Sequence, residues 1–249
     1  MTASVKNVLK KVLYKLGYEL YGVPRQWQGD APIPDLSFYR PFFSPWLGYG
    51  AFAGLYKEAA PFTLVPPERC WVLFSLARQA LNLPGDFAEC GVYKGGTAML
   101  LSRVASQAPP PGKKLLLFDS FSGMLQTDAS KDLHQPGHFA DTSLEAVQQR
   151  VSWFHGAEFH QGWIPESFRG VEPRRFSFVH IDVDLHQSVL DCCEFIYPRL
   201  SPGGFMVFDD YGLPSCPGAR RAVDTFFDKR PEVPLVLANG QAVVFKQGA

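Results

Sequence analysis

Two short apolar runs, each followed by a pair of aspartates, constrain the fold of this chain more than any other feature. Residues 176–181 precede Asp182-Val183-Asp184, and residues 204–208 precede Asp209-Asp210. Short apolar runs bounded by turn residues are typical of strands that are buried on both faces of a parallel sheet. Neighbouring strands lie about 4.8 Å apart, so the carboxylates meet at one sheet edge if these two strands are adjacent.

Carboxylates that converge in this way predict a metal site. Like charges repel and raise one another's pKa unless a cation lies among them. Oxygen ligands of this kind suit Mg²⁺, Mn²⁺ or Ca²⁺. The alternative is that these aspartates only end strands and begin helices, which is common. Two pairs on strands that are separated by a single helix favour the metal site.

Apolar runs and helical segments alternate from residue 66 onward. Strands are expected at 86–90, 114–118, 158–161, 176–181 and 204–208. Helices are expected after Pro67, from Gly95 to Val104, over 143–154 with Ser143 as the cap, and over 187–199 and 216–230. Asn239-Gly240-Gln241 predicts a closing hairpin. The pattern predicts an α/β fold with a seven-stranded, mostly parallel sheet, a C-terminal antiparallel hairpin and helices on both faces.

The composition suits a globular protein. Of 249 residues, 46% are hydrophobic and 19% charged, and the net charge is zero, so a large core is possible and no basic cluster indicates a nucleic-acid partner. No apolar stretch is long enough to span a bilayer and no signal sequence is evident, which favours the cytoplasm. The five cysteines include no CxxC pair, so neither a disulfide framework nor a zinc site is expected.

The first 62 residues differ from the rest. Residues 5–21 form a basic amphipathic pattern, which predicts a helix that packs on its own domain or makes weak contact with a membrane surface. Residues 22–62 are rich in Pro, Gly and aromatic residues and predict an irregular packed cover, either a substrate lid or an oligomer contact. We therefore divide the chain into 1–62 and 63–249, and we expect a homo-oligomer.

The turn after the first predicted strand, Glu89 to Thr97, contains three glycines that allow a close approach of backbone to ligand. It is not GxGxxG, so by itself it is equally consistent with a simple tight turn. Asp119 ends the second predicted strand, where an acidic residue can accept hydrogen bonds from ribose hydroxyls. The alternative is that Asp119 caps the loop over 120–122.

Taken together, the segments 89–96, 118–121, 162–163, 181–185 and 200–211 resemble the macrocin O-methyltransferase (TylF/MycF) family over roughly residues 60–246. The resemblance implies the Rossmann-like class I fold of methyltransferases that depend on S-adenosylmethionine, and a requirement for Mg²⁺. It also implies transfer of a methyl group to a hydroxyl of a sugar or glycosylated natural product, with a small molecule or glycan as acceptor.

Carried over by position, the resemblance implies site residues. Those expected at the donor are Thr63, Glu89, Cys90, Gly91, Val92, Tyr93, Gly95, Asp119, Ser120, Phe121, Gly123, Gln161, Gly162, Trp163 and Asp182. Those expected at the metal are Asp182, Asp209 and Asp210. Cys90 departs from the family, in which a small polar residue is expected. The loop 124–142 and residues 1–60 do not align, although they should shape the acceptor pocket.

The catalytic residues are expected among Asp182, Asp184 and His186, which could remove the proton of the acceptor hydroxyl. A surface position at a helix start is the alternative for His186. His134 and His138 are separated by Pro136-Gly137, which breaks a helix, so we expect both to be solvated rather than bound to a metal.

Two other functions remain open. Asp182-Val183-Asp184 is a DxD pattern, which in a glycosyltransferase can hold a metal and a nucleotide-sugar diphosphate, but the turn at Glu89 and Asp119 would then have no role. A non-catalytic binding protein on the same fold is the other alternative. An NAD oxidoreductase is less consistent with the sequence because the glycine spacing is wrong.

Overall fold

The computed structural model describes residues 12, 13, 15, 16 and 43–248. By contacts the chain divides into two compact units, Met1–Phe42 and Phe43–Ala249. In the first unit Val12, Leu13 and Lys15 are helical, and the Leu16 N–H donates to the Val12 carbonyl (3.2 Å). The remainder of the predicted helix over 5–21, and the aromatic segment before Phe43, lie outside the described residues.

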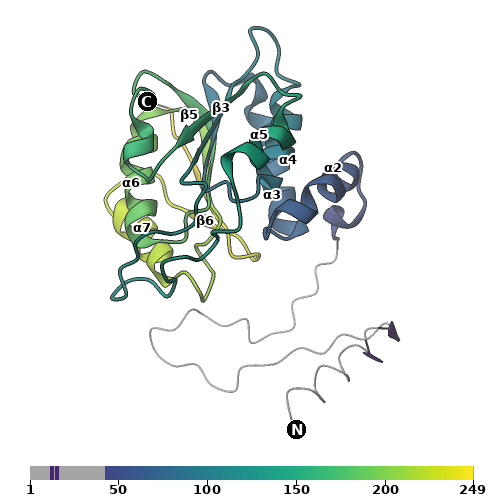
Figure 1. Ribbon diagram of the computed structural model, residues 1–249. Coiled ribbons are helices and arrows are strands. Elements are labelled where there is room, and N and C mark those ends of the chain that lie inside the picture. Colours follow the sequence, from purple (N-terminus) through teal and green to yellow (C-terminus); the bar gives the residue numbers. More distant parts are fainter. Residues whose placement is uncertain (1–11, 14, 17–42, 249) are drawn as a thin grey trace. The chain divides into compact units, whose positions relative to one another are not determined.

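The second unit is built on a seven-stranded sheet in the order β3-β2-β1-β4-β5-β7-β6. The strands are β1 Asp86–Cys90, β2 Leu115–Asp119, β3 Ala157–Gln161, β4 Phe176–Ile181, β5 Leu200–Phe208, β6 Leu235–Val236 and β7 Ala242–Phe245. The first five are parallel, whereas β7 runs antiparallel to both β5 and β6. This confirms the predicted sheet and its closing hairpin (Figure 1).

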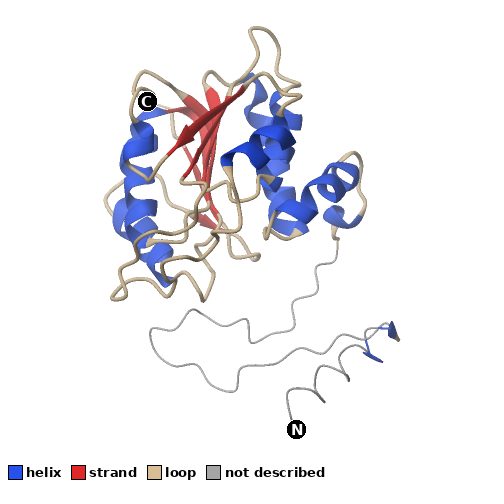
Figure 2. Cartoon of the chain, viewed as in Figure 1, coloured by secondary structure: helices blue, strands red, loops and turns tan. Residues whose placement is uncertain are grey.

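Helices cover both faces of the sheet, as predicted (Figure 2). One face carries α6 His186–Ile196 and α7 Pro217–Phe227, and the other carries α3 Pro67–Gln79, α4 Gly96–Ala105 and α5 Leu144–Val151. The helix α2 Phe52–Ala59 packs on α3 and α4. The predicted cap of α5 is confirmed, because Ser143 Oγ accepts a hydrogen bond from the Ala146 N–H (3.2 Å). Among the described helices, none combines the length and apolarity that a bilayer span requires.

The sheet separates two apolar cores, which explains the continuous apolar runs of the strands. Side chains alternate along each strand, so Phe87 and Phe178 pack beneath α3 and α4, while Ala88 and Val179 pack beneath α6 and α7. The rings of Phe87 and Phe178 are 5.5 Å apart. Each fully buried phenylalanine contributes about 1.5–3 kcal/mol through the hydrophobic effect.

The segment from residue 43 to 62 is helical where it was predicted to be irregular. Its strong helix formers form α2, and Pro61 lies just beyond the end of that helix. Phe52 is fully buried, with its ring 5.1 Å from Trp71 and 5.5 Å from Phe74. This segment therefore belongs to the same core as α3. The division at residue 62, the homo-oligomer and the cytoplasmic location stay predictions.

Candidate active site

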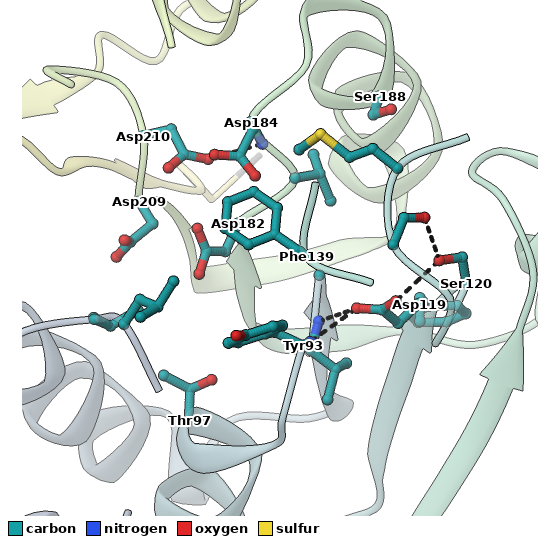
Figure 3. A pocket seen from close by; sticks show the side chains of 18 of the residues that line it. Tyr93, Thr97, Asp119, Ser120, Phe139, Asp182, Asp184, Ser188, Asp209 and Asp210 are labelled. Carbon is teal, nitrogen blue, oxygen red and sulfur yellow. Dashed lines mark hydrogen bonds between the residues drawn. The ribbon is translucent and has the colours of Figure 1, made fainter. Parts of the chain in front are cut away.

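A cavity of about 260 Å³ lies at the carboxyl ends of β1 to β5. Parallel α/β sheets bind their ligands at this edge. Figure 3 shows Asp182, Asp184, Asp209 and Asp210 gathered at one end, and Asp119 with Ser120 on the opposite side. The predicted meeting of the four aspartates is confirmed, since β4 and β5 are adjacent and Ile181 pairs with Phe208.

Gly91 allows the turn after β1 to approach the end of β4 closely. Its φ is +86°, and a Cβ at this position would lie 1.8 Å from the Asp182 carbonyl oxygen. The Asp182 N–H donates to the Cys90 carbonyl at 2.8 Å. Only glycine adopts this conformation without a steric penalty. The sequence predicted that this turn approaches a ligand closely, whereas at Gly91 the close approach is to the backbone of Asp182. This contact holds the glycine turn beside the aspartates.

Asp119 lies on the opposite side of the cavity from the four aspartates and accepts hydrogen bonds from two turns (Figure 3). Its Oδ2 accepts hydrogen bonds from the N–H groups of Val92 (2.6 Å) and Tyr93 (2.9 Å), and its Oδ1 accepts one from Phe121 (2.7 Å). The carboxylate therefore links the turn after β1 to the turn after β2. Its bond to the Phe121 N–H is the loop-capping role that was the alternative for Asp119. Asp119 also lines the cavity, where further lone pairs can accept hydrogen bonds.

Asp182 and Asp210 are acids without a cation partner. Among the described residues neither forms an ion pair. Burial and the charge of Asp209 raise the pKa of Asp182 well above its usual value, and burial with the charges of Asp184 and Asp182 does the same for Asp210. Both shifts express the cost of holding uncompensated negative charge in one confined space.

Asp209 is compensated. It pairs with the Arg69 guanidinium, accepts a hydrogen bond from Gln241 Nε2 (2.7 Å), and lies 3.5 Å from His180 Nε2. Burial favours the neutral acid, but His180 and Arg69 outweigh it and lower the pKa of Asp209. Burial likewise opposes charge on His180, yet Asp209 and Glu89 raise the pKa of the imidazole to about 10.

The residues at this end of the cavity fit a divalent cation held by oxygen. Arg69 and His180 balance Asp209 and Glu89, which leaves the carboxylates of Asp182, Asp184 and Asp210 in excess. A divalent ion would offset that excess, and carboxylates are the ligands that Mg²⁺ prefers. The bonds from Arg69 and Gln241 to Asp209 are of the kind that orient a ligating carboxylate.

Most of the residues predicted for the donor line the cavity. These are Thr63, Gly91, Val92, Tyr93, Asp119, Ser120, Gly123, Gly162, Trp163 and Asp182. The others do not. Glu89 points into the sheet, where its Oε1 lies 2.9 Å from His180 Nδ1.

Four further predicted donor residues also lie away from the cavity. Cys90 and Phe121 are buried in the two cores. Gly95 is packed against Val147, and Gln161 is exposed.

His186 does not line the cavity, which removes the support for its predicted catalytic role. Its backbone N–H donates to Asp132 Oδ1 at 2.9 Å. Its ring Nδ1 is buried without a hydrogen-bond partner among the described residues, and burial lowers the pKa of the imidazole. His186 is the first residue of α6, which begins two residues beyond Asp184, so its position follows from the helix start that was the alternative.

His134 approaches the aspartates instead, so the prediction that it is solvated is wrong. Its Nε2 lies 3.4 Å from Asp184 Oδ1, and its side chain is only 14% exposed. Loop residues have no periodicity that could have revealed this. The other lining residues that the sequence did not indicate are Phe62, Leu64, Val65, Arg69, Thr97, Phe118, Met124, Phe139, Ile164, Val183, Ser188, Leu213 and Ser215.

Three residues of the cavity rim hold left-handed backbone conformations although they are not glycine. The φ angles are 50° for Tyr93, 57° for Phe139 and 57° for Asp184. Such conformations cost about 1–3 kcal/mol each and persist where surrounding contacts impose them. For Asp184 the contact is a hydrogen bond from its backbone N–H to Asp210 Oδ2 (2.9 Å), which fixes the carboxylates of β4 and β5 relative to each other.

Comparison with known proteins gives a consistent result. Residues 62–247 match the family described as macrocin-O-methyltransferase (TylF). The chain is 31% identical over 161 residues to the mycinamicin III 3''-O-methyltransferase of Micromonospora griseorubida, covering 59% of this chain and 62% of that protein. It is 30% identical over 146 residues to a tetracenomycin-C rhamnosyl 4'-O-methyltransferase of Streptomyces olivaceus, covering 54% and 56%. The aligned part is thus less than two thirds of either relative.

Solved structures agree on the fold. The O-methyltransferase NovP superimposes with a TM-score of 0.66 at 23% identity, over 75% of this chain and 83% of NovP. The calicheamicin methyltransferase CalS11 gives a TM-score of 0.60 at 19% identity, over 78% of this chain and 92% of CalS11. These likenesses support the class I methyltransferase fold that the strand order indicates.

Proposed function

Because this chain belongs to the macrocin-O-methyltransferase (TylF) family, we propose that it transfers a methyl group from S-adenosylmethionine to a hydroxyl of a sugar on a natural product. The observation that carries the proposal is the single cavity that joins the glycine turn at Gly91 to the four aspartates. The two curated relatives described above are named for O-methylation, one at a 3'' and one at a 4' position.

We assign the donor to the part of the cavity between the turn after β1 and the end of β2. Gly91, Val92 and Tyr93 contribute backbone there, and Asp119 and Ser120 contribute polar side chains. Asp119 holds the two turns in fixed register through its three backbone hydrogen bonds. S-adenosylmethionine supplies an electrophilic methyl group on a sulfonium centre. The contribution of these residues is to hold donor and acceptor in line, which is the main requirement of a displacement reaction.

We assign a divalent cation, most simply Mg²⁺, to Asp182, Asp209 and Asp210. A bound divalent cation supplies Lewis-acid chemistry that eases loss of a hydroxyl proton. Arg69 and Gln241 orient Asp209, and the backbone N–H of Asp184 orients Asp210. Asp182 lies between the donor turn and the other aspartates, because the Gly91 turn packs directly on its backbone.

We assign the removal of the acceptor proton to Asp184. It lines the cavity but does not belong to the proposed cation set, so its carboxylate can accept a proton while the other three hold charge. In the overall reaction the acceptor O–H bond breaks and an O–CH₃ bond forms. The methyl–sulfur bond of the donor breaks, and the proton passes to Asp184 and then to solvent.

The test combines a donor analogue with an activity assay. We expect S-adenosylhomocysteine to raise the melting temperature of the protein, and glycosylated hydroxyl acceptors with donor and Mg²⁺ to gain one methyl group by mass spectrometry. Asp182→Ala should lose transfer, while its binding of S-adenosylhomocysteine stays measurable. Glu194→Ala, an exposed acid on α6, should retain both.

The same experiment separates the alternatives. Stabilisation by a nucleotide diphosphate rather than by S-adenosylhomocysteine would indicate a glycosyltransferase that uses Asp182-Val183-Asp184. Donor binding without transfer to any acceptor of a broad panel would favour a binding protein on the same fold. Methylation of catechols alone would refute the sugar acceptor and retain the methyltransferase. Full activity of Asp182→Ala would refute its assignment to the cation.

A further inference from the structure

A second group of side chains that could hold a metal lies at the cavity and shares no residue with the proposed cation set of Asp182, Asp209 and Asp210. It consists of His134 from the loop before α5, Asp184 after β4, and Cys216 before α7. His134 Nε2 lies 3.4 Å from Asp184 Oδ1, Cys216 Sγ lies 3.2 Å from the same oxygen, and the nitrogen and sulfur are 3.5 Å apart. One imidazole, one thiol and one carboxylate thus form a triangle with nearly equal edges.

The size of this triangle matches one face of a tetrahedral zinc site. With nitrogen and oxygen ligands at about 2.0 Å and sulfur at about 2.3 Å, tetrahedral geometry separates two ligand atoms by about 3.3–3.6 Å. We propose that His134, Asp184 and Cys216 form a binding site for a Zn²⁺-like divalent cation. The soft thiol and the imidazole favour such an ion over Mg²⁺, which selects oxygen ligands.

The three ligand atoms are held in place by their surroundings. His134 Nδ1 lies 3.1 Å from Nδ1 of His138, an orienting contact of the kind that sets the ring of a ligating histidine and leaves Nε2 directed at the site. The backbone N–H of Asp184 is bonded to Asp210, and the N–H of Cys216 donates to the Leu213 carbonyl at 3.0 Å. A site held in this way requires little rearrangement to bind an ion.

In the absence of a metal the Cys216 thiol donates a hydrogen bond to Asp184. Binding of the cation replaces the proton of this thiol, which is released to solvent, and the thiolate becomes a ligand. His134, Asp184 and Ser215 all line the cavity, so the site is accessible from it.

The site has a consequence for catalysis that rests on the proposed function. A cation bound there would occupy Asp184, the proposed proton acceptor, and would join the loop that carries His134 to the end of β4 and the start of α7. We therefore expect micromolar Zn²⁺ to inhibit methyl transfer at saturating Mg²⁺. Cys216→Ser should relieve this inhibition.

The binding test needs no acceptor and no activity. Protein freed of other metals and kept at saturating Mg²⁺ should bind about one equivalent of Co²⁺, with the strong visible absorption of a tetrahedral site and the near-ultraviolet band of a thiolate ligand. Zn²⁺ should displace both bands. Cys216→Ser should lose the thiolate band, and His134→Gln should weaken Co²⁺ binding by at least about tenfold.

Matched controls exclude other residues. Cys193→Ala removes a thiol buried in α6, and His155→Gln removes an exposed imidazole, so both should leave the titration unchanged. Circular dichroism checks that every variant is folded. A thiolate band that persists in folded Cys216→Ser, or Co²⁺ binding by the unaltered protein with no thiolate band, would overturn the site. Neither result depends on whether the protein transfers methyl groups, so failure of this site and failure of the proposed function are distinguishable.

Discussion

At the scale of single residues, the four aspartates of the cavity differ in their partners although all follow buried strands. Asp209 is paired with Arg69 and Gln241, whereas Asp182 and Asp210 form no ion pair among the described residues. Their positions could be predicted because parallel strands bring their carboxyl ends to one edge. The partners of Asp209 could not be predicted, because Arg69 on α3 and Gln241 before β7 are far from Asp209 in the sequence.

Glu89 shows the same limit. A carboxylate at the end of a strand beside a glycine turn suggests a ligand contact, and the resemblance implied one. The register of β1 and β4 instead places Glu89 opposite His180, fully buried. The zinc-like site at His134, Asp184 and Cys216 was equally hidden, because no ligand spacing exists when each residue comes from a separate segment.

Glu89→Gln should therefore act on stability. The substitution removes the charge that balances His180 and leaves a buried imidazolium short of one partner. Breaking a buried ion pair on one side typically costs about 3–5 kcal/mol, so the midpoint of urea unfolding should fall markedly. Glu194→Gln, an exposed acid, is the control. Unchanged stability together with lost binding of S-adenosylhomocysteine would instead support the contact with the donor.

At the scale of elements, strands and helices followed the predicted order because periodicity and turn residues are local signals. β5 begins at Leu200, before the predicted apolar run, since its early residues pair with β4 across a register shift that only tertiary contact produces. The loop 124–142 could be predicted as a loop, but its contacts could not. Asp141 at its end bonds to Tyr93 Oη (2.8 Å) and pairs with Lys94, which joins the loop to the turn after β1.

The close packing of the Gly91 turn on the end of β4 can be tested by substitution. In Gly91→Ala the new methyl would collide with the Asp182 carbonyl, and φ would be strained. Gly170→Ala is a matched control, because its φ of +84° is similar but nothing lies within 4 Å of the added carbon. We expect the control to lose about 1–2 kcal/mol from backbone strain alone. Gly91→Ala should lose clearly more in urea unfolding and should also lose donor binding.

The C-terminal strand is anchored by a pH-sensitive contact. Glu232 accepts hydrogen bonds from the Tyr197 hydroxyl (2.5 Å) and the Gln247 N–H (3.2 Å), and lies 3.4 Å from Lys246 Nζ. Burial alone would raise its pKa, but the bonds from Tyr197 and Gln247 and the charge of Lys246 lower it below the usual 4.5.

A lowered pKa means that the anchor contributes fully above the unfolded value near 4.5, and that this contribution is lost as the pH falls through the folded value. Glu232→Gln should therefore cost about 1–2 kcal/mol at pH 7, from hydrogen bonds to a charged group. The difference from the unaltered protein should shrink when unfolding is measured progressively below pH 4.5. A difference that is constant with pH would show that the carboxylate charge has no role.

At the scale of the whole molecule, the doubly covered sheet and its edge of acids could be predicted together, because one topology explains both. The boundary of the compact unit is harder to predict. Composition suggested a cover that ends at residue 62, whereas contacts place residues 43–62 in the same unit as the sheet. The helix α2 is too short to show a clear helical periodicity in the sequence. The residues that bury its Phe52, Trp71 and Phe74, lie on the next helix, so the sequence alone does not reveal this contact.

Two truncations test where the fold begins. A chain of residues 43–249 keeps Phe52 and the contacts of α2 with α3 and α4, while a chain of residues 63–249 exposes Trp71 and Phe74. Loss of one buried phenylalanine costs about 3–5 kcal/mol, so the shorter chain should melt at a clearly lower temperature or fail to fold. It should also bind S-adenosylhomocysteine more weakly, because Phe62 lines the cavity and Gly96 at the start of α4 packs on Ala59 and Phe62. Equal melting temperatures and affinities of the two chains would show that residues 43–62 are a separable cover after all.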